Sequence, residues 1–431
     1  MLIQDLYQVF LKHPVVCTDS RKSIKDAVFF ALKGTSFNGN AYAREALDKG
    51  CAYAVVDDPS TACDERYLLV KDGLEALQQL ARLHRSNHPI PVLAITGSNG
   101  KTTTKELIHT VLSKKYQTIA TPGNLNNHIG VPLTLLSITG QTEIAVVEMG
   151  ANHPGEISLL CQIALPDLGI ITNIGRAHLE GFGSFEGVIH AKNELYISVR
   201  ERGGTLFVNA DNAFLMHLSE SISRVTYAIN STASVMGSCI SAIPFLKARI
   251  TDAEQEKVYP VSSQLTGVYN LENMLAAFTV GRYFHVDADR IIQAIEGYRP
   301  GNMRSQLTET KYNRVIVDAY NANPSSMEAA LINFAGLPDP DKWLVLGDML
   351  ELGAETMREH RIIMDLVIRL NLKKGLLIGE HFSLVDVPPG FLTFPDVEKA
   401  RIFLEMNPIR GGMVLLKGSR AMGLEKLIGI L

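Results

Sequence analysis

The residues best suited to chemistry form one continuous run: Thr96, Gly97, Ser98, Asn99, Gly100, Lys101, Thr102 and Thr103. An apolar segment, 92–95, precedes the run, and a helical pattern over 105–112 follows it. Strand, glycine loop and helix with Gly-Lys-Thr at the turn is the layout of a phosphate-binding loop. Backbone N–H groups and the helix N-terminus attract phosphate oxygens. We expect Lys101 to reach the β- and γ-phosphates of a nucleotide and the Thr102 hydroxyl to bind Mg²⁺.

The loop departs from the longer phosphate-loop pattern, because Ile95 stands where that pattern has its first glycine. The compact Thr-Gly-x-x-Gly-Lys-Thr form remains. The alternative interpretation is a glycine-rich turn with a surface lysine.

Polar residues also follow two other predicted strands. Glu148 ends the apolar segment 144–148, and a glycine-rich loop containing His178 follows segment 168–172. The carboxyl ends of parallel strands meet at one edge of a sheet, where such proteins bind ligands. Glu148 is suited to Mg²⁺, which is usually held by one or two carboxylates plus substrate phosphates. His178 could bind a second cation or orient a phosphate; an ordinary rim carboxylate and a solvated histidine are the alternatives.

Three further positions attract attention less strongly. Lys192 lies on a predicted helix, where the pattern alone makes it a surface lysine. Asn270 is a reasonable N-cap for a helix over 270–284, which leaves Asn273 as an unexplained polar residue in its first turn.

A similar cluster follows the predicted strand 315–317. Asp318 and Asn321 lie at the carboxyl end of that strand, and Ser325 or Ser326 could cap the next helix. A turn and a cap account for the serines but not for Asp318 and Asn321.

The elements that would position these residues fall into three α/β units. We expect strands at 27–32 and 52–56 with a helix at 42–49 between them, and a helix over 73–86 capped by Asp72. A proline-rich break at 88–91 and a second linker at 299–302 divide the chain into segments 1–87, 88–300 and 301–431. Strands at 92–95, 144–148, 168–172 and 206–209 alternate with helices in the middle unit, which predicts a parallel sheet covered on both faces. Strands at 315–317, 343–346, 375–378 and 413–416 repeat this pattern in the last unit.

Composition excludes several classes of function. The chain has 431 residues and a formal net charge of −4, without a long basic cluster, which argues against nucleic acid as a partner. No apolar run is long enough to span a membrane, and the N-terminus does not resemble a signal peptide. The five cysteines are scattered and form no Cys-x-x-Cys pair, so structural zinc is not expected. We therefore expect a cytoplasmic protein that is not integral to a membrane.

Taken together, these motifs resemble the Mur ligases, the ATP-dependent amino-acid and peptide ligases of peptidoglycan synthesis. The resemblance covers essentially the whole chain. Besides the phosphate loop it is carried by segments 18–21, 29–34, 37–40, 123–132, 320–324, 346–353 and 417–420. The Asp-Asn-Pro-Arg motif of the family member that adds the third residue is absent from the last unit.

The resemblance implies a fold of three α/β domains: a uridine-nucleotide domain, a central domain like the P-loop ATPases, and a Rossmann-like C-terminal domain. It implies ATP and two Mg²⁺ ions, with Glu148 and His178 as metal ligands. It also implies that Lys192 is carbamylated and faces the second Mg²⁺. Asn273 would contact adenine, while Arg304, Asp318 and Asn321 would bring the C-terminal domain onto the nucleotide.

The resemblance further implies the substrates UDP-N-acetylmuramoyl-tripeptide and D-alanyl-D-alanine and a monomeric enzyme. Catalytic roles would belong to Lys101, Glu148, His178, Lys192 and Asn127. Substrate contacts would come from Ser20, Arg21, Lys33, Gly34, Asn38, Asn124, Asn127, Asn323, Lys417, Ser419 and Arg420. Asn124 and Asn127 both fit the asparagine of the family's loop. The sequence departs from the family pattern at Asn38, where aspartate is usual, and at Asn302 and Met303, which stand before Arg304 in place of the usual glycine.

Two alternatives to this function remain open at the level of sequence. One is a ligase of the same fold with another acceptor, such as the enzyme adding the third residue or one extending folate with glutamate. The other is a nucleotide-binding scaffold without catalytic activity.

Overall fold

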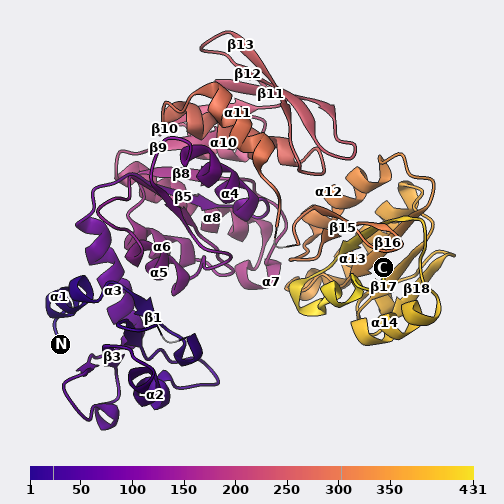
Figure 1. Cartoon of the computed structure of the whole chain (residues 1–431). Helices are drawn as coiled ribbons and strands as arrows, with labels where there is room; N and C mark the ends of the chain where they lie inside the picture. The colour runs from indigo at the N-terminus through magenta and orange to yellow at the C-terminus, as the bar shows by residue number, and fades with distance from the viewer. Residues whose placement is uncertain (23, 302) are drawn as a thin grey trace.

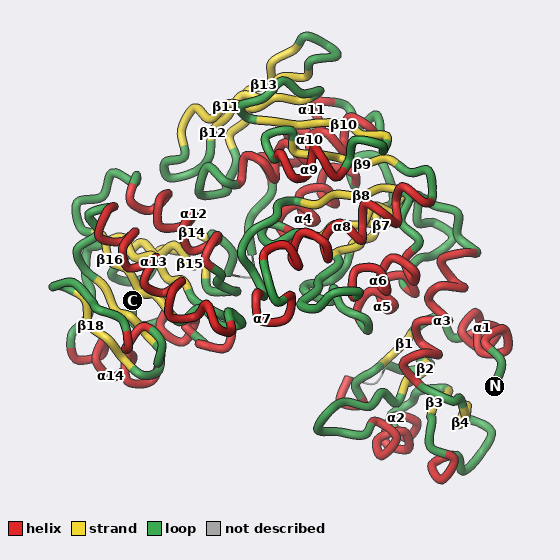
Figure 2. The backbone as a smooth tube through the Cα atoms, turned by 180° about the vertical axis from the view of Figure 1, so that it is seen from behind, coloured by secondary structure: helices red, strands yellow, loops and turns green. Residues whose placement is uncertain are grey.

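The computed structural model describes residues 1–22, 24–301 and 303–431, and within them it contains three β-sheets of four, nine and six strands. Each sheet belongs to its own body, and the three bodies follow one another along the chain from indigo to yellow (Figure 1). The view from behind shows the N-terminal and C-terminal bodies on opposite sides of the central one (Figure 2). The predicted three-domain α/β fold is confirmed.

The N-terminal domain is a small parallel sheet in the order β1-β2-β3-β4. Asp72 caps the N-terminus of the long helix α3, as predicted, by accepting a hydrogen bond of 2.8 Å from the Glu75 N–H. The helix expected at 42–49 begins at Ala43, because a 3₁₀ turn over Gly39–Tyr42, capped by Asn38, precedes it. The elements are β1 (Val16–Cys17), β2 (Val28–Phe30), β3 (Tyr53–Val56), β4 (Tyr67–Leu69), α1 (Ile3–Lys12), α2 (Ala43–Asp48) and α3 (Gly73–Ser86).

The central domain is built on a sheet in the order β13-β12-β11-β10-β9-β8-β5-β7-β6. Its strands are β5 (Val92–Thr96), β6 (Thr118–Ala120), β7 (Ile144–Glu148), β8 (Leu168–Ile171), β9 (Thr205–Asn209), β10 (Ser223–Ala228), β11 (Val235–Ser241), β12 (Lys247–Asp252) and β13 (Lys257–Ser262). Its helices are α4 (Lys101–Leu112), α5 (Gly130–Leu136), α6 (Glu156–Ala164), α7 (Leu179–Phe182), α8 (Phe185–Glu201), α9 (Ala213–Leu218), α10 (Asn270–Tyr283) and α11 (Ala288–Gly297).

Helices cover both faces of this sheet, as the continuous apolar strands predicted. Along β5, Val92 and Ala94 join one core layer, whereas Leu93 and Ile95 join the other, because successive side chains of a strand point to opposite faces. The first layer also contains Leu77 and Leu80 of α3, which therefore joins the N-terminal domain to the central one.

The four strands predicted for this sheet pair in parallel, which confirms that expectation, but no strand was predicted over residues 235–262. β11, β12 and β13 form an antiparallel extension, seen at the top of Figure 1. Short turns join these strands, so no crossover helix is needed, and the outer strands keep one face exposed.

The C-terminal domain has a sheet in the order β14-β15-β19-β16-β17-β18, parallel except for β14 at the edge. It confirms all four strands expected there. Its elements are β14 (Gln306–Glu309), β15 (Arg314–Asp318), β16 (Lys342–Gly347), β17 (Gly375–Ile378), β18 (Phe391–Phe394), β19 (Met413–Lys417), α12 (Pro324–Ala335), α13 (Thr356–Arg369) and α14 (Val397–Met406).

Two predicted helix caps were wrong. Asn270 is the first residue of α10 rather than its cap, and its amide nitrogen instead donates to the Thr266 carbonyl at 2.8 Å. Asn323 caps α12 by accepting from the Ser326 N–H at 2.9 Å, and Ser326 reciprocates from the third helical position. Of the predicted linker 299–302, Asn302 lies outside the described residues.

Candidate active site

The phosphate-binding loop connects β5 to α4 in the way the sequence predicted. Gly97 and Gly100 adopt φ angles of 146° and 79°, which residues other than glycine rarely adopt. A Cβ atom on Gly97 would lie 1.9 Å from the Thr172 hydroxyl oxygen, and one on Gly100 would lie 2.7 Å from the Asn273 amide oxygen. Both glycines are therefore required by conformation and by space.

The loop is fixed to the segment that follows β8. The Ser98 and Asn99 N–H groups donate to the carbonyl and side-chain oxygens of Asn173 at 3.0 and 2.9 Å. The Thr172 hydroxyl donates to the Asn99 carbonyl at 2.6 Å. These contacts fix the shape of the loop from two sides, so its backbone N–H groups are held in place for a phosphate.

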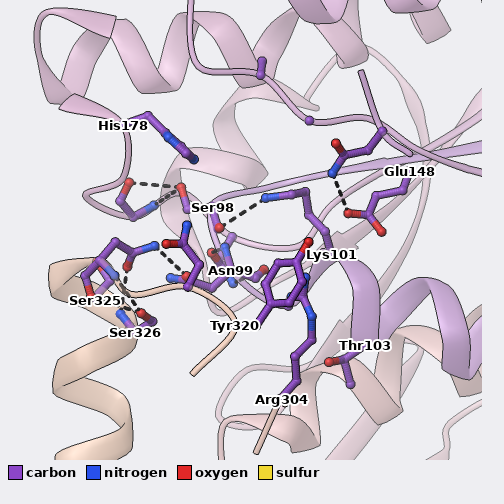
Figure 3. A pocket seen from close by; sticks show the side chains of 18 of the residues that line it. Ser98, Asn99, Lys101, Thr103, Glu148, His178, Arg304, Tyr320, Ser325 and Ser326 are labelled. Carbon is purple, nitrogen blue, oxygen red and sulfur yellow. Dashed lines mark hydrogen bonds between the residues drawn. The ribbon is translucent and has the colours of Figure 1, made fainter. Parts of the chain in front are cut away.

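Lys101 folds back over this cradle. Its ammonium donates to the Gly97 carbonyl at 2.6 Å and to the Ser98 carbonyl at 3.3 Å (Figure 3). Burial lowers the pKa of Lys101 to about 8, although Glu148 partly opposes this shift. Burial thus disfavours the charged form of Lys101, and this ammonium lies where the phosphates of a nucleotide would lie.

Thr102 and Glu148, the two residues expected to hold Mg²⁺, lie in contact with each other. The Thr102 hydroxyl lies 3.1 and 3.0 Å from the two Glu148 carboxylate oxygens, and both side chains are buried. The Asn126 amide donates to Glu148 at 2.8 Å and the Lys105 ammonium lies 3.5 Å away. Within the described part of the chain, no three histidine, cysteine or acidic side chains cluster as a metal site. The Thr102 hydroxyl and the Glu148 carboxylate are hard oxygen donors of the kind that Mg²⁺ takes together with phosphate oxygens.

His178 lies on the loop facing this set and lines the same cavity (Figure 3). It adopts a left-handed φ of 52° immediately before α7. Its Nδ1 atom contacts the carboxylate of Glu351 from the C-terminal domain, and this contact keeps the pKa of Glu351 low.

Lys192 is not the surface lysine that its sequence pattern suggested. It is 2% exposed on α8, and its ammonium lies 5.3 Å from the centre of the Phe182 ring. No described hydrogen-bond acceptor or carboxylate pairs with it. Burial and the neighbouring Lys101 charge lower the pKa of Lys192 to about 7.

The C-terminal domain contributes Arg304 and Asp318 to the site. The Arg304 guanidinium stacks 3.7 Å from the centre of the Tyr320 ring. Asp318 accepts a hydrogen bond from the Lys417 ammonium at 2.5 Å and one from the Ser305 N–H at 3.1 Å. These two residues and their partners Ser305, Tyr320 and Lys417 line one cavity together with the phosphate loop.

That cavity has a volume of about 760 Å³ and lies between the central and C-terminal domains. Asn273 lines it, although its amide already bonds the Thr104 hydroxyl and Asn270. Asn321 also lines it, and Asn323 donates to the Asn99 side chain at 2.8 Å, which joins the two domains across the loop. The predicted residues that line the cavity are Ser98, Asn99, Gly100, Lys101, Thr103, Asn127, Glu148, His178, Asn273, Arg304, Asp318, Asn321, Asn323 and Lys417.

The predicted residues of the N-terminal domain do not line this cavity. Arg21 is exposed and pairs with Asp19, and Lys33 pairs with Asp57 at 2.9 Å. The other three are fixed by local structure: Ser20, whose carbonyl accepts from Lys49; Gly34, packed against Phe37; and Asn38, which caps a 3₁₀ turn.

Among the loop asparagines, the structure distinguishes roles that the sequence left open. Asn127 lines the cavity, but its side-chain oxygen caps the start of α5 by accepting from the Ile129 and Gly130 N–H groups. Asn124 is exposed and outside the cavity lining, while Asn126 contacts Glu148.

Just after β19, at the same carboxyl edge of the sheet as Asp318, two predicted substrate residues contact neighbouring loops. Ser419 is buried and accepts from the Leu350 N–H at 2.9 Å. Arg420 is exposed, and its guanidinium lies 5.9 Å from the centre of the Tyr320 ring.

Sequence reasoning missed four residues of this site: Lys105, Asn126, Tyr320 and Glu351. Each lies next to a motif that was noticed, but its role depends on a partner distant in the sequence. Composition and periodicity give no signal for such pairs, so the structure was needed to find them.

The fold and site define a nucleotide-binding α/β protein whose phosphate loop is closed over by a second domain. Three family models match the chain: "Mur ligase family, catalytic domain" at residues 14–85, "Mur ligase middle domain" at 95–281 and "Mur ligase, glutamate ligase domain" at 303–420. The chain belongs to the Mur ligase family, which confirms the predicted class of enzyme.

Individual relatives cover almost the whole chain. UDP-N-acetylmuramoyl-tripeptide–D-alanyl-D-alanine ligase of Bacillus subtilis is 35% identical, covering 96% of this chain and 92% of the relative. The protein of the same name from Escherichia coli is 33% identical with the same coverage. The crystal structure of MurF from Acinetobacter baumannii matches with a TM-score of 0.88 at 30% identity, covering 99% of this chain and 97% of that one. MurF ligase from Thermotoga maritima in complex with ADP matches with a TM-score of 0.85 at 26% identity, covering 97% of both chains.

In the described part of the chain, every helix is too short or too polar to cross a membrane.

Proposed function

We propose that this protein is an ATP-dependent ligase that joins D-alanyl-D-alanine to the free carboxyl end of UDP-N-acetylmuramoyl-tripeptide. The observation that carries the proposal is the single cavity into which the phosphate loop, Glu148, His178 and Arg304 all project. Its relatives of 33–35% identity bear the name of this reaction. The ADP complex of the Thermotoga maritima protein supports ATP as the nucleotide.

The first step is attack of the tripeptide carboxylate on the γ-phosphorus of ATP, which gives an acyl phosphate and ADP. Two anions must approach one another, so positive charge at the site lowers the barrier. Lys101, the N-terminus of α4 and Arg304 supply that charge. In doing so Lys101 exchanges its bonds to the Gly97 and Ser98 carbonyls for phosphate oxygens.

Thr102 and Glu148 are the residues that would hold Mg²⁺, because their oxygens already lie side by side in a buried pocket. The ion would neutralise phosphate charge and orient the triphosphate. His178 and a modified Lys192 are the proposed ligands of a second Mg²⁺.

Lys192 suits carbamylation because it is buried without an anionic partner among the described residues. Its neutral amine would form an N–C bond with carbon dioxide and lose one proton to water. The product replaces a cation with an anion that offers two hard oxygens. The lowered pKa of Lys192 supports the reaction, since only the unprotonated amine is nucleophilic.

In the second step the amine of D-alanyl-D-alanine attacks the acyl carbon, and the tetrahedral intermediate expels phosphate. Exclusion of water protects the acyl phosphate until the amine arrives. The contacts of Asn323 with Asn99 and of Ser325 with the Arg176 N–H hold the C-terminal domain over the loop (Figure 3).

We assign roles to the segments accordingly. Segment 1–87 would bind the uridine nucleotide through Ser20, Arg21, Lys33, Gly34 and Asn38. Segment 88–300 would bind ATP, and segment 301–431 would close on it and receive the dipeptide. We further propose a cytoplasmic monomer, which suits soluble substrates.

A coupled phosphate-release assay tests the proposal. Phosphate should appear only when ATP, UDP-N-acetylmuramoyl-tripeptide and D-alanyl-D-alanine are all present. Release with a single amino acid or with glutamate in place of the dipeptide would instead indicate a ligase with another acceptor. ATP binding without turnover under every combination would indicate a scaffold.

A further inference from the structure

Arg304 is oriented in an unusual way for an arginine in a cleft. Its guanidinium lies 3.7 Å from the centre of the Tyr320 ring, while its buried Nε atom has no hydrogen-bond partner. Within the described residues, no carboxylate lies within ion-pairing distance of it. Among the described residues, the stack on Tyr320 is therefore the interaction that orients this guanidinium.

The nearby carboxylate that could have paired with Arg304 is engaged elsewhere. Asp318 faces the Lys417 ammonium at 2.5 Å, and its other oxygen accepts from the Ser305 N–H at 3.1 Å. Lys417 is 2% exposed, so the pair is shielded from solvent. This arrangement leaves the N–H edge of Arg304 available to an incoming anion.

The backbone beside Arg304 is also constrained. Met303 and Ser305 on either side have left-handed φ angles of 57° and 48°. Ser305 is tied to the central domain through its hydroxyl, 2.6 Å from the Tyr269 hydroxyl, and through its carbonyl, which accepts from Thr266. The backbone position of Arg304 is thus fixed, and the direction of its side chain depends on the group that the guanidinium packs against.

We propose that Tyr320 is a positioning residue that directs Arg304 toward the nucleotide phosphates. A carboxylate in that place would orient the guanidinium but would also compete with phosphate for its charge. An aromatic face orients the planar group by cation–π attraction and leaves its hydrogen-bond donors free. This inference rests on the proposed function, since it assumes a polyanionic nucleotide in the cavity.

The test compares full-length variants in the phosphate-release assay with ATP varied and both other substrates saturating. Tyr320→Phe keeps the ring and should stay within about two-fold of the wild type. Tyr320→Leu and Tyr320→Met remove the ring and should lower kcat/KM for ATP by about ten-fold, the scale of one desolvated cation–π contact. In a second series, with the tripeptide nucleotide varied and ATP saturating, the KM for the tripeptide nucleotide should not change. Tyr312→Leu is the matched control, because it removes a ring that Arg410 overlies at 4.8 Å outside the cavity.

A double-mutant cycle with Arg304→Lys separates positioning from general structure. In that background the loss of the ring should add little, because a lysine ammonium does not stack in the same way. Wild-type kinetics in both ring-less variants, additive losses in the cycle, or an equal loss in Tyr320→Phe would each overturn the inference. If the wild type itself releases no phosphate, the proposed function fails instead.

Discussion

Lys101→Met should slow ligation strongly without destabilising the folded protein. Removal of one charged contact to a transition state typically costs at least about 100-fold in rate, so phosphate release should fall by that factor or more. The stability effect follows from the pKa of Lys101. Burial lowers it from 10.5 to about 8, so at pH 7 the folded state holds the proton less tightly than the unfolded chain does.

The size of that effect can be worked out. The difference between 10.5 and about 8 corresponds to a cost of about 3 kcal/mol for keeping the charge at pH 7. Solvent screens part of this cost because the side chain is partly exposed. The bonds to the Gly97 and Ser98 carbonyls offset about 1 kcal/mol each. Methionine should therefore leave the protein as stable as the wild type or more stable, by up to about 1 kcal/mol.

Urea unfolding and the phosphate-release assay measure the two quantities on the same preparation. Adding ADP provides a control, since it should stabilise the wild type and stabilise the variant much less. A variant that keeps its turnover, or that loses about 2 kcal/mol or more of stability, would refute the assignment of Lys101 as a phosphate-binding cation held at an energetic cost.

Other predictions concern neighbouring features. Asn126→Ala removes the 2.8 Å bond to Glu148 and should lower kcat/KM by about ten-fold and raise the Mg²⁺ concentration needed, as a magnesium titration would show. Lys192→Ala should lose activity that a short-chain carboxylic acid partly restores and bicarbonate does not; full activity would exclude a role. Burial lowers the pKa of His84, so the folded protein keeps it neutral while the unfolded chain binds a proton below about pH 6.5. Stability should therefore fall as the pH drops below that value, less steeply in His84→Gln; parallel urea-unfolding profiles would contradict this. Asp72→Ala should cost about 1 kcal/mol in urea unfolding by removing the cap of α3.

The parts of the fold that could be predicted are those fixed by local pattern. β7 and β17 lie at the expected residues because buried parallel strands are continuous apolar runs. The antiparallel extension of β11–β13 was missed because none of its strands is a continuous buried run: β12 alternates between exposed and buried residues, and β11 and β13 are largely exposed. Pairing between these strands is decided by tertiary contacts rather than by propensity.

The site divides in the same way. The phosphate loop could be predicted because its glycines, lysine and threonine are adjacent in sequence. The burial of Lys192 could not, since its helix pattern does not reveal which neighbours enclose it. The Arg304–Tyr320 stack depends on how the linker before β14 lies beside the carboxyl end of β15, which only the tertiary structure shows.

The central claim is that ATP activates the peptide carboxylate as an acyl phosphate. Its most direct test uses tripeptide nucleotide labelled with ¹⁸O in the terminal carboxylate, followed by mass analysis of the phosphate released during ligation. We predict that each phosphate carries one labelled oxygen, because the bridging oxygen leaves with phosphorus when the amine attacks. Unlabelled phosphate released in step with ligation would contradict the mechanism.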